Sequence, residues 1–194
     1  VFVILFFSLV KKYTFKKSIL SFLSVSFILG LMVVLFLQIN PYMKEKYSSV
    51  TFDHIDKIGK LDEIEHPEIH VFNSLVTRLS IWQSAKDLYL ESPIIGYGAA
   101  DAKQSLVAYF KKTDQQFLAK YEFPVHNQFL DYLLKFGLLG GVVFILYCSF
   151  PFYIGFKLTD GLVISFALLY FISNLTDDFL IRFDGIVFSG LFIT

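Results

Sequence analysis

Cysteine is nearly absent from this sequence, which has a single one, Cys148, among 194 residues. One thiol excludes both an internal disulfide framework and a metal site built from several cysteines. Because Cys148 lies inside an apolar run, we interpret it as a buried structural thiol. A charge excess is missing too, since 17 basic residues balance 17 acidic ones. That balance removes the overall basic field that would favour a nucleic-acid partner.

Polar residues are scarcer than in a soluble domain, because hydrophobic residues make up 55% of the chain and its mean hydropathy is +0.60. Soluble domains have about 45–50% apolar residues. The excess is gathered in runs that approach the roughly 20 residues needed by a membrane-spanning helix. The chain also lacks an initiator methionine and a signal-peptide pattern, and begins at Val1 and ends at Thr194 inside apolar runs. We therefore expect a fragment of a larger polytopic membrane protein.

Five apolar segments are expected to cross the membrane, the first and last of them cut short: residues 1–10, 18–39, 129–156, 161–176 and 185–194. Four lysines and no acid fill the first connection: Lys11, Lys12, Lys16 and Lys17. Short basic loops lie on the cytoplasmic side, so residues 40–127 should lie on the opposite side. The chain is thus divided into spans at 1–39, an external loop at 40–127 and further spans at 128–194.

The first part of the external loop, residues 42–70, shows no sustained apolar period. Its acidic cluster at 62–70 contains His66 and His70 and could suggest a divalent metal site. A solvated acidic loop broken by Pro67 is the favoured interpretation, because nothing orients these groups toward a common centre. His54, His66 and His70 therefore have weak claims to a catalytic role.

Helical spacing returns after Asn73, where Asn73 or Ser74 can cap a helix. Its apolar positions are Leu75, Leu79, Trp82, Ala85 and Tyr89. Ser92-Pro93 stops this helix, and Gly96-Tyr97-Gly98 predicts a turn that needs backbone freedom. A second amphipathic helix is expected over 101–112. Both helices are too polar to span, so we expect them to lie along the membrane interface with their apolar faces toward lipid.

The last part of the loop leads into a long apolar helix. Pro124 precedes His126 and Asn127, and Asp131 and Lys135 follow at a helical i,i+4 spacing. Three glycines in the same helix predict the close approach of a neighbour: Gly137, Gly140 and Gly141. Residues 157–160 should form a tight inner turn, and residues 177–184 a short acidic outer loop.

Arg78 and His126 are the residues we select for chemistry. A guanidinium group donates in a rigid fork that suits phosphate oxygens, although Arg78 could equally be a helix arginine that reaches the lipid head groups. Imidazole can take a proton near neutral pH, which activation of a hydroxyl nucleophile requires. Taken alone, His126 is more simply read as a helix cap or a solvent-exposed residue. Asn127 could orient the ring or the substrate.

An ordered set of short motifs resembles the O-antigen ligase family over roughly residues 18–180. The set is Arg78-Leu79-Ser80-Ile81-Trp82, then Pro93 to Gly98, then His126-Asn127-Gln128-Phe129-Leu130, and finally Gly137-Leu138-Leu139-Gly140. In that family an Arg and a Trp open the ordered part of a large periplasmic loop, and a His-Asn pair precedes the next helix. Members have about a dozen spans and further functional arginines upstream, which this chain lacks.

The resemblance implies an all-α, polytopic transmembrane bundle in the bacterial inner membrane, with a large, partly helical periplasmic loop. It implies an inverting, metal-independent glycosyltransferase without a cofactor, which moves a glycan from undecaprenyl pyrophosphate to an acceptor sugar hydroxyl such as that of lipid A core. His126 would then be catalytic. The substrate-binding residues would be Arg78, Trp82, Gly96, Gly98 and Asn127, with Arg78 on the donor pyrophosphate. Nucleic acid is not an expected partner.

Three alternatives remain open. A related polymerase joins repeat units on the same lipid carrier and differs only in its acceptor. A transporter would want charged or broken positions in mid-span, and residues 18–39 and 144–156 contain no charge. A purely structural membrane anchor gives no reason for the series of motifs. The missing upstream sequence, and its arginines in outer loops, would discriminate best among these.

Overall fold

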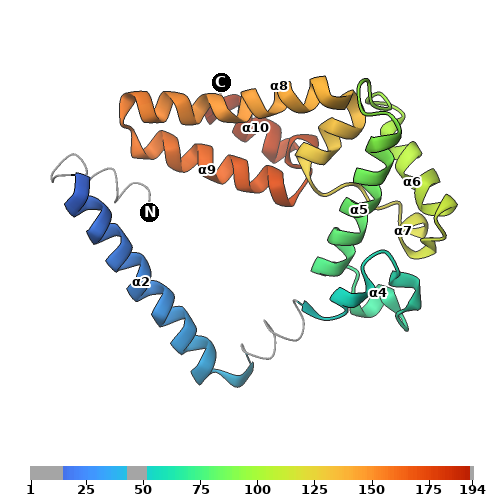
Figure 1. The fold of residues 1–194 in the computed structure, drawn as a ribbon, viewed down its shortest axis with the longest axis horizontal. Coiled ribbons are helices and arrows are strands. Elements are labelled where there is room, and N and C mark those ends of the chain that lie inside the picture. The colour runs from blue at the N-terminus through green and yellow to red at the C-terminus, as the bar shows by residue number, and fades with distance from the viewer. Residues whose placement is uncertain (1–14, 43–51, 193–194) are drawn as a thin grey trace.

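The computed structural model describes residues 15–42 and 52–192, and each element within them is helical (Figure 1). In chain order they are α2 (Phe15–Ile39), η2 (Ile55–Lys57), η3 (Leu61–Glu63), α4 (Pro67–His70), α5 (Leu75–Glu91), α6 (Ala102–Lys112), α7 (Gln116–Lys120), α8 (Gln128–Leu158), α9 (Gly161–Thr176), η4 (Phe179–Ile181) and α10 (Phe183–Phe192). The prediction of an all-α fold is confirmed for the residues that the structure describes.

Within residues 15–42 and 52–192, two helices are long and apolar enough to cross a bilayer, α2 and α8. The predicted segment 18–39 lies within α2, and 161–176 coincides with α9, which has 16 residues and is shorter than a typical span. Helix α10 covers most of the predicted segment 185–194. Residues 1–10, Lys11, Lys12 and residues 193–194 lie outside the described residues.

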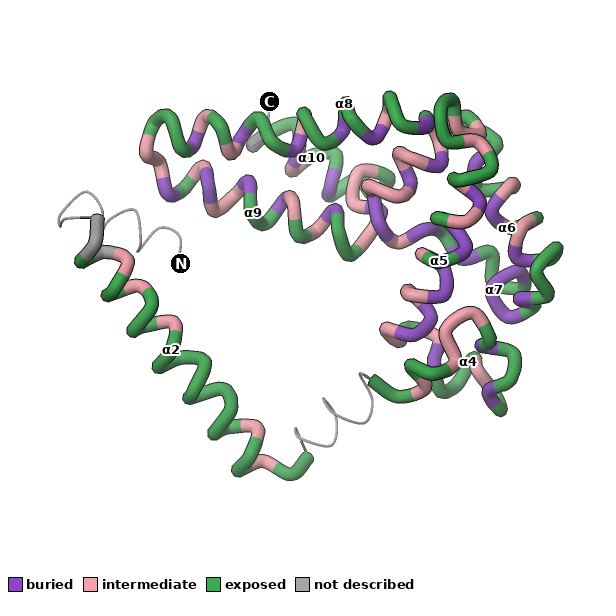
Figure 2. Tube along the Cα trace, in the orientation of Figure 1, coloured by how far each residue is buried: buried purple, intermediate pink, exposed green. Residues whose placement is uncertain are grey.

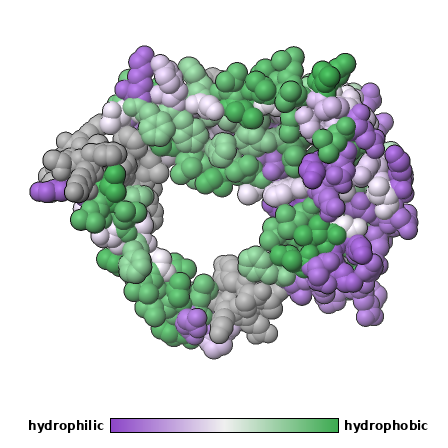
Figure 3. Space-filling view, in the orientation of Figure 1, coloured by the Kyte–Doolittle hydropathy of each residue, from purple (hydrophilic) through white to green (hydrophobic). Residues whose placement is uncertain are grey.

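Helix α2 stands apart from the other helices (Figure 1), and none of its most apolar window is buried. Figure 3 shows hydrophobic surface over α2 and along α8, and hydrophilic surface over the end of the molecule formed by α4 to α7. A helix that is apolar on all sides needs an apolar environment around it. The surface of α2 is suited to lipid or to further spans.

A compact core joins α5, α6, α7 and the beginning of α8 (Figure 2). Its fully buried side chains include Val76, Ile81, Leu106, Phe110, Leu118 and Leu134. Helix α5 begins as predicted, with the Ser74 hydroxyl accepting the Thr77 N–H at 3.4 Å. The expectation that the apolar face of α6 lies on lipid is wrong, because Leu106 and Phe110 are buried in this core. On α5 the predicted face is only partly covered: Ala85, Trp82 and Tyr89 pack in or against the core, while Leu75 and Leu79 are half-buried and lie outside it. Helical spacing alone cannot say which apolar partner covers a face.

Helix α8 is broken at Gly137, where φ is 62° and ψ is −159°, so the uninterrupted span predicted over 129–156 is wrong. The turn after α5 packs into this break. A Cβ on Gly137 would lie 2.1 Å from the Ile94 carbonyl oxygen, which only glycine tolerates. The predicted close approach at this glycine is confirmed, and the neighbour is the Pro93–Gly98 turn. A straight run of about 20 residues, 138–158, remains for the membrane.

The turn satisfies the backbone at the break. Tyr97 N–H donates to the Leu134 carbonyl at 2.9 Å and Gly98 N–H to Lys135 at 2.8 Å, while Leu138 N–H donates to Pro93 at 2.8 Å. These bonds pair the groups that a broken helix leaves without partners. Gly96 and Gly98 have φ of 73° and 83°, so the predicted need for backbone freedom is confirmed.

Helices α8 and α9 form an antiparallel pair around the predicted tight turn (Figure 1). Asp160 caps α9 by accepting the N–H groups of Leu162 and Val163. Cys148 is 1% exposed and packs with Phe144 and Tyr170 in a second cluster, which confirms the buried thiol. This pairing returns the chain at Thr176 to the end of the molecule where α8 begins.

Candidate active site

His126 and Asn127 form the junction between the segment that ends at Val125 and α8. Asn127 is buried and caps α8, with its Oδ1 accepting the Leu130 N–H at 3.1 Å and its Nδ2 donating to the Leu175 carbonyl at 3.0 Å. Both ends of this amide are therefore used to join α8 to the end of α9. Within the structure, Asn127 positions the histidine before it.

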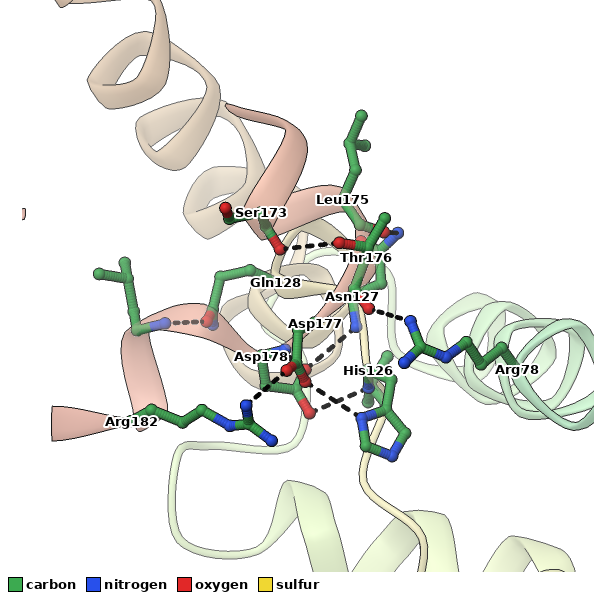
Figure 4. Close-up of polar contacts among 12 residues, drawn as sticks. Arg78, His126, Asn127, Gln128, Ser173, Leu175, Thr176, Asp177, Asp178 and Arg182 are labelled. Carbon is green, nitrogen blue, oxygen red and sulfur yellow. Dashed lines mark hydrogen bonds and ion pairs between the residues drawn. The ribbon is translucent and has the colours of Figure 1, made fainter. Parts of the chain in front are cut away.

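Asp178 holds the backbone of that junction. Its two carboxylate oxygens accept the N–H groups of His126 at 2.9 Å and of Asn127 at 3.1 Å (Figure 4). These two hydrogen bonds support His126 in a left-handed conformation with φ of 53°, which is uncommon for a residue with a side chain. Burial raises the pKa of the Asp178 carboxyl, and the hydrogen bonds from His126 and Asn127 oppose that rise.

Asp177 binds the ring of the same histidine. Its Oδ1 lies 3.2 Å from His126 Nδ1, and its Oδ2 lies 3.0 Å from Arg182 Nη1 (Figure 4). Burial pushes the pKa of Asp177 upward, but the hydrogen bond from His126, with Arg182 close by, outweighs burial and leaves the pKa lowered. The ionised carboxylate thus fixes the orientation of the imidazole.

Arg78 reaches the same segment from α5. Its Nη1 donates to the carbonyl of Thr176, the residue before Asp177. One turn later on α5, Trp82 Nε1 donates to the Val125 carbonyl at 3.0 Å, directly before His126. Arg78 and Trp82 therefore hold the two segments that meet at the histidine. The guanidinium is anchored within the protein, which argues against simple contact with head groups.

The structure thus brings four of the predicted site residues together, Arg78, Trp82, His126 and Asn127, and does not bring the two glycines with them. Gly96 packs on the α8 break, where a Cβ would lie 2.7 Å from Leu134 O and Gly137 N. The positive φ at both positions and the close packing at Gly96 explain why glycine occupies positions 96 and 98.

Three residues of the site were missed by sequence reasoning: Asp177, Asp178 and Arg182. They lie about 50 residues beyond His126, so no local spacing connects them to it. A signal was nevertheless present, because the outer loop at 177–184 should lie on the same side of the membrane as the loop that ends at His126. The two adjacent aspartates directly after the predicted span 161–176 were the observation that could have identified this part of the site.

Metal ligation has one candidate among the described residues. Ligand atoms of His126, Asp177 and Asp178 lie within 4.8 Å of one another. Both oxygens of Asp178 already accept backbone N–H groups, and those of Asp177 face His126 and Arg182. A cation at this position would share these oxygens with their present partners and would lie close to the Arg182 guanidinium. Metal independence stays a prediction, and this pattern of partners is compatible with it.

The acidic cluster at 62–70 does not converge on a common centre. Asp62 accepts the Phe117 N–H at 2.7 Å, Glu63 pairs with Lys57 at 2.7 Å, and Glu68 lies 3.5 Å from His66. Asp62, Glu63 and Glu68 thus have separate partners. This favours the solvated, acidic loop over the metal site.

Comparison with known proteins gives one match. A family model described as O-antigen ligase matches residues 1–145, about three quarters of the chain. The matched range includes Arg78, Trp82, His126 and Asn127, and it ends before Asp177 and Arg182. Neither the curated proteins nor the solved structures contain a match. The matched family consists of inner-membrane glycosyltransferases of the ligase and polymerase type, which act on lipid-linked glycans.

Proposed function

The chain belongs to the O-antigen ligase family, and we propose that it transfers a glycan from undecaprenyl pyrophosphate to an acceptor sugar hydroxyl such as that of lipid A core. The observation that carries this proposal is the meeting of Arg78 and His126 on one short segment, 176–178. The two residues lie 48 positions apart in sequence and come from different elements. An anchor or a simple helix cap would not need this arrangement.

His126 acts as the general base in this proposal. When Nδ1 carries the proton and donates to Asp177, Nε2 keeps its lone pair for the acceptor hydroxyl. The hydroxyl oxygen attacks the anomeric carbon as its proton passes to Nε2. The bond between that carbon and the pyrophosphate oxygen breaks, and the electron pair leaves with undecaprenyl pyrophosphate. Attack opposite the leaving group inverts the anomeric centre.

Arg78 stabilises the leaving group. A guanidinium carries five N–H donors, and the structure records one hydrogen bond from Arg78, to Thr176, within the described residues. The bound side chain presents a fixed positive charge toward the region of His126. Charge that develops on the departing pyrophosphate is stabilised by such preorganised donors. Arg182, which forms an ion pair with Asp177, adds a second guanidinium to the same region.

The membrane topology of this proposal places 40–127 and 177–184 on the periplasmic side, with the lysine-rich connection and the turn at 157–160 on the cytoplasmic side. Contact between His126 and Asp177 supports it, because both segments must then lie on one side. The antiparallel α8 and α9 supply the crossing and the return. Chain regions 1–39 and 128–194 act as spans around the active loop.

A polymerase is the second candidate, since the site residues would serve either acceptor. The two differ in what a reconstituted system needs. With lipid-linked repeat units alone, a polymerase extends the glycan on its carrier. A ligase forms product only when a lipid A core acceptor is added.

The proposal is tested by His126→Ala in proteoliposomes that contain the lipid-linked donor and the acceptor, with product followed on gels. Loss of the base should lower the transfer rate by about 10²-fold or more. His70→Ala is the matched control, because His70 is exposed on α4 and should leave the rate unchanged. Full-rate transfer by an inserted His126→Ala protein would contradict the catalytic role.

A further inference from the structure

The turn that fills the break in α8 exposes two large apolar side chains. Ile94 is 75% exposed and Ile95 is 78% exposed. No charge occurs from Ser92 to Ala100. Exposed isoleucines side by side in an uncharged turn are unusual for a segment in contact only with water.

These isoleucines are held at the outer end of the long apolar run of α8. Pro93 accepts the N–H of Leu138, the first residue after the break, and the Ile94 carbonyl packs on Gly137. The turn therefore has little freedom to move relative to α8. Its depth along the membrane normal follows that of Leu138.

The apolar surface continues from the turn onto α8. Leu138 is 58% exposed and Leu139 is 73% exposed, and no charge occurs in α8 from Phe136 to Phe156. Figure 3 shows hydrophobic surface along α8 as far as the end beside the turn. If 138–158 crosses the bilayer, the leucines at its outer end lie in lipid, and the isoleucines lie beside them.

We propose that Ile94 and Ile95 insert into the outer leaflet of the membrane and anchor the loop core to lipid. The occupant of this surface is the acyl-chain region below the head groups, because the patch is apolar, uncharged and continuous with a span. The anchor fixes the height of α5, and with it Arg78, above the bilayer. Transfer chemistry does not enter this inference, which depends only on the crossing of α8.

Spin labels give the depth directly. A nitroxide is attached to Ile94→Cys or Ile95→Cys in the protein reconstituted in lipid nanodiscs, and its collisions with oxygen and with a water-soluble nickel chelate are compared. Ile69→Cys is the control, since Ile69 is 73% exposed but lies on α4. Cys148, at 1% exposure, should not take the label, and unsubstituted protein checks this.

Labels at 94 and 95 should collide several-fold more with oxygen than with nickel, and the label at 69 should show the reverse. Nickel accessibility at 95 equal to that at 69 would place the turn in water and overturn the proposal. Low accessibility to both reagents would also overturn it, because the isoleucines would then contact protein. None of these outcomes depends on glycan transfer, so failure here leaves the proposed function standing.

Discussion

Asp177 connects two positively charged or protonatable partners, His126 on one oxygen and Arg182 on the other. A carboxylate in this position fixes the ring and its tautomer. Because the pKa of Asp177 is lowered in the folded chain, its ionised form stabilises the fold above the usual carboxyl range. That contribution is lost as the pH falls through the lowered pKa.

Asp177→Asn should lower the transfer rate by about 10²-fold or more, because an amide no longer holds the proton on Nδ1 of a general-base imidazole. The amide keeps the size of the side chain but removes its charge, so insertion should be unaffected.

Asp184→Asn is the matched control for that change, since Asp184 is exposed in the first turn of α10. Its transfer rate should equal that of the parent. A full transfer rate in the Asp177→Asn protein would show that the carboxylate does not act on the ring.

The break in α8 is the feature that sets the shape of the site at the scale of elements. Gly137 faces Ile94 and Gly96 faces Leu134, so two glycines allow the backbones of a turn and a helix to touch. This contact fixes the residue at which the part of α8 after the break begins. It also fixes the position of the short part before the break, which Asn127 caps. The break therefore positions His126 relative to the membrane.

Gly137→Ala should destabilise the fold by about 1–3 kcal/mol, because a side chain meets both the left-handed backbone and the Ile94 carbonyl. Denaturant unfolding in detergent, followed by the fluorescence of the single tryptophan, Trp82, measures this. Gly30→Ala serves as the control, because its Cβ would meet nothing within 4 Å. Equal unfolding midpoints for the two variants would remove the break from its structural role.

Local order was predictable from sequence. The Ser74 cap and the spacing of Leu106 and Phe110 indicated α5 and α6, since capping and helical period act within a few residues. The break at Gly137 was not predictable, because its cause is a turn about 40 residues earlier. Asp178 was missed for the same reason, as its partners lie 51 and 52 residues away.

At the scale of the whole molecule, the proposed topology puts two segments of the site, 40–127 and 177–184, on one side of a membrane. Gln104→Cys places a thiol at an exposed position of α6, and this thiol should react with an impermeant maleimide in intact spheroplasts. Lys17→Cys, exposed at the start of α2, should react only after lysis. The opposite pattern would reverse the topology and remove the periplasmic assignment.

The fold was predictable as a class from composition, because apolar runs of span length are an intrinsic property of the chain. Family membership followed from motifs spread over the ordered loop, Arg78-Leu79-Ser80-Ile81-Trp82 among them. The direction of the amphipathic faces was not predictable. Leu106 and Phe110 could have faced lipid equally well until α5 was seen to cover them.

The grip of Asp177 and Asp178 on the histidine has a consequence for biosynthesis. The ribosome delivers Arg78 and His126 before α9 has been made, and the aspartates emerge only after it. A chain halted before residue 177 would hold the base and the guanidinium without the segment that joins them. In the proposed enzyme, the joined site can therefore form only after α8 and α9 have been made and have paired.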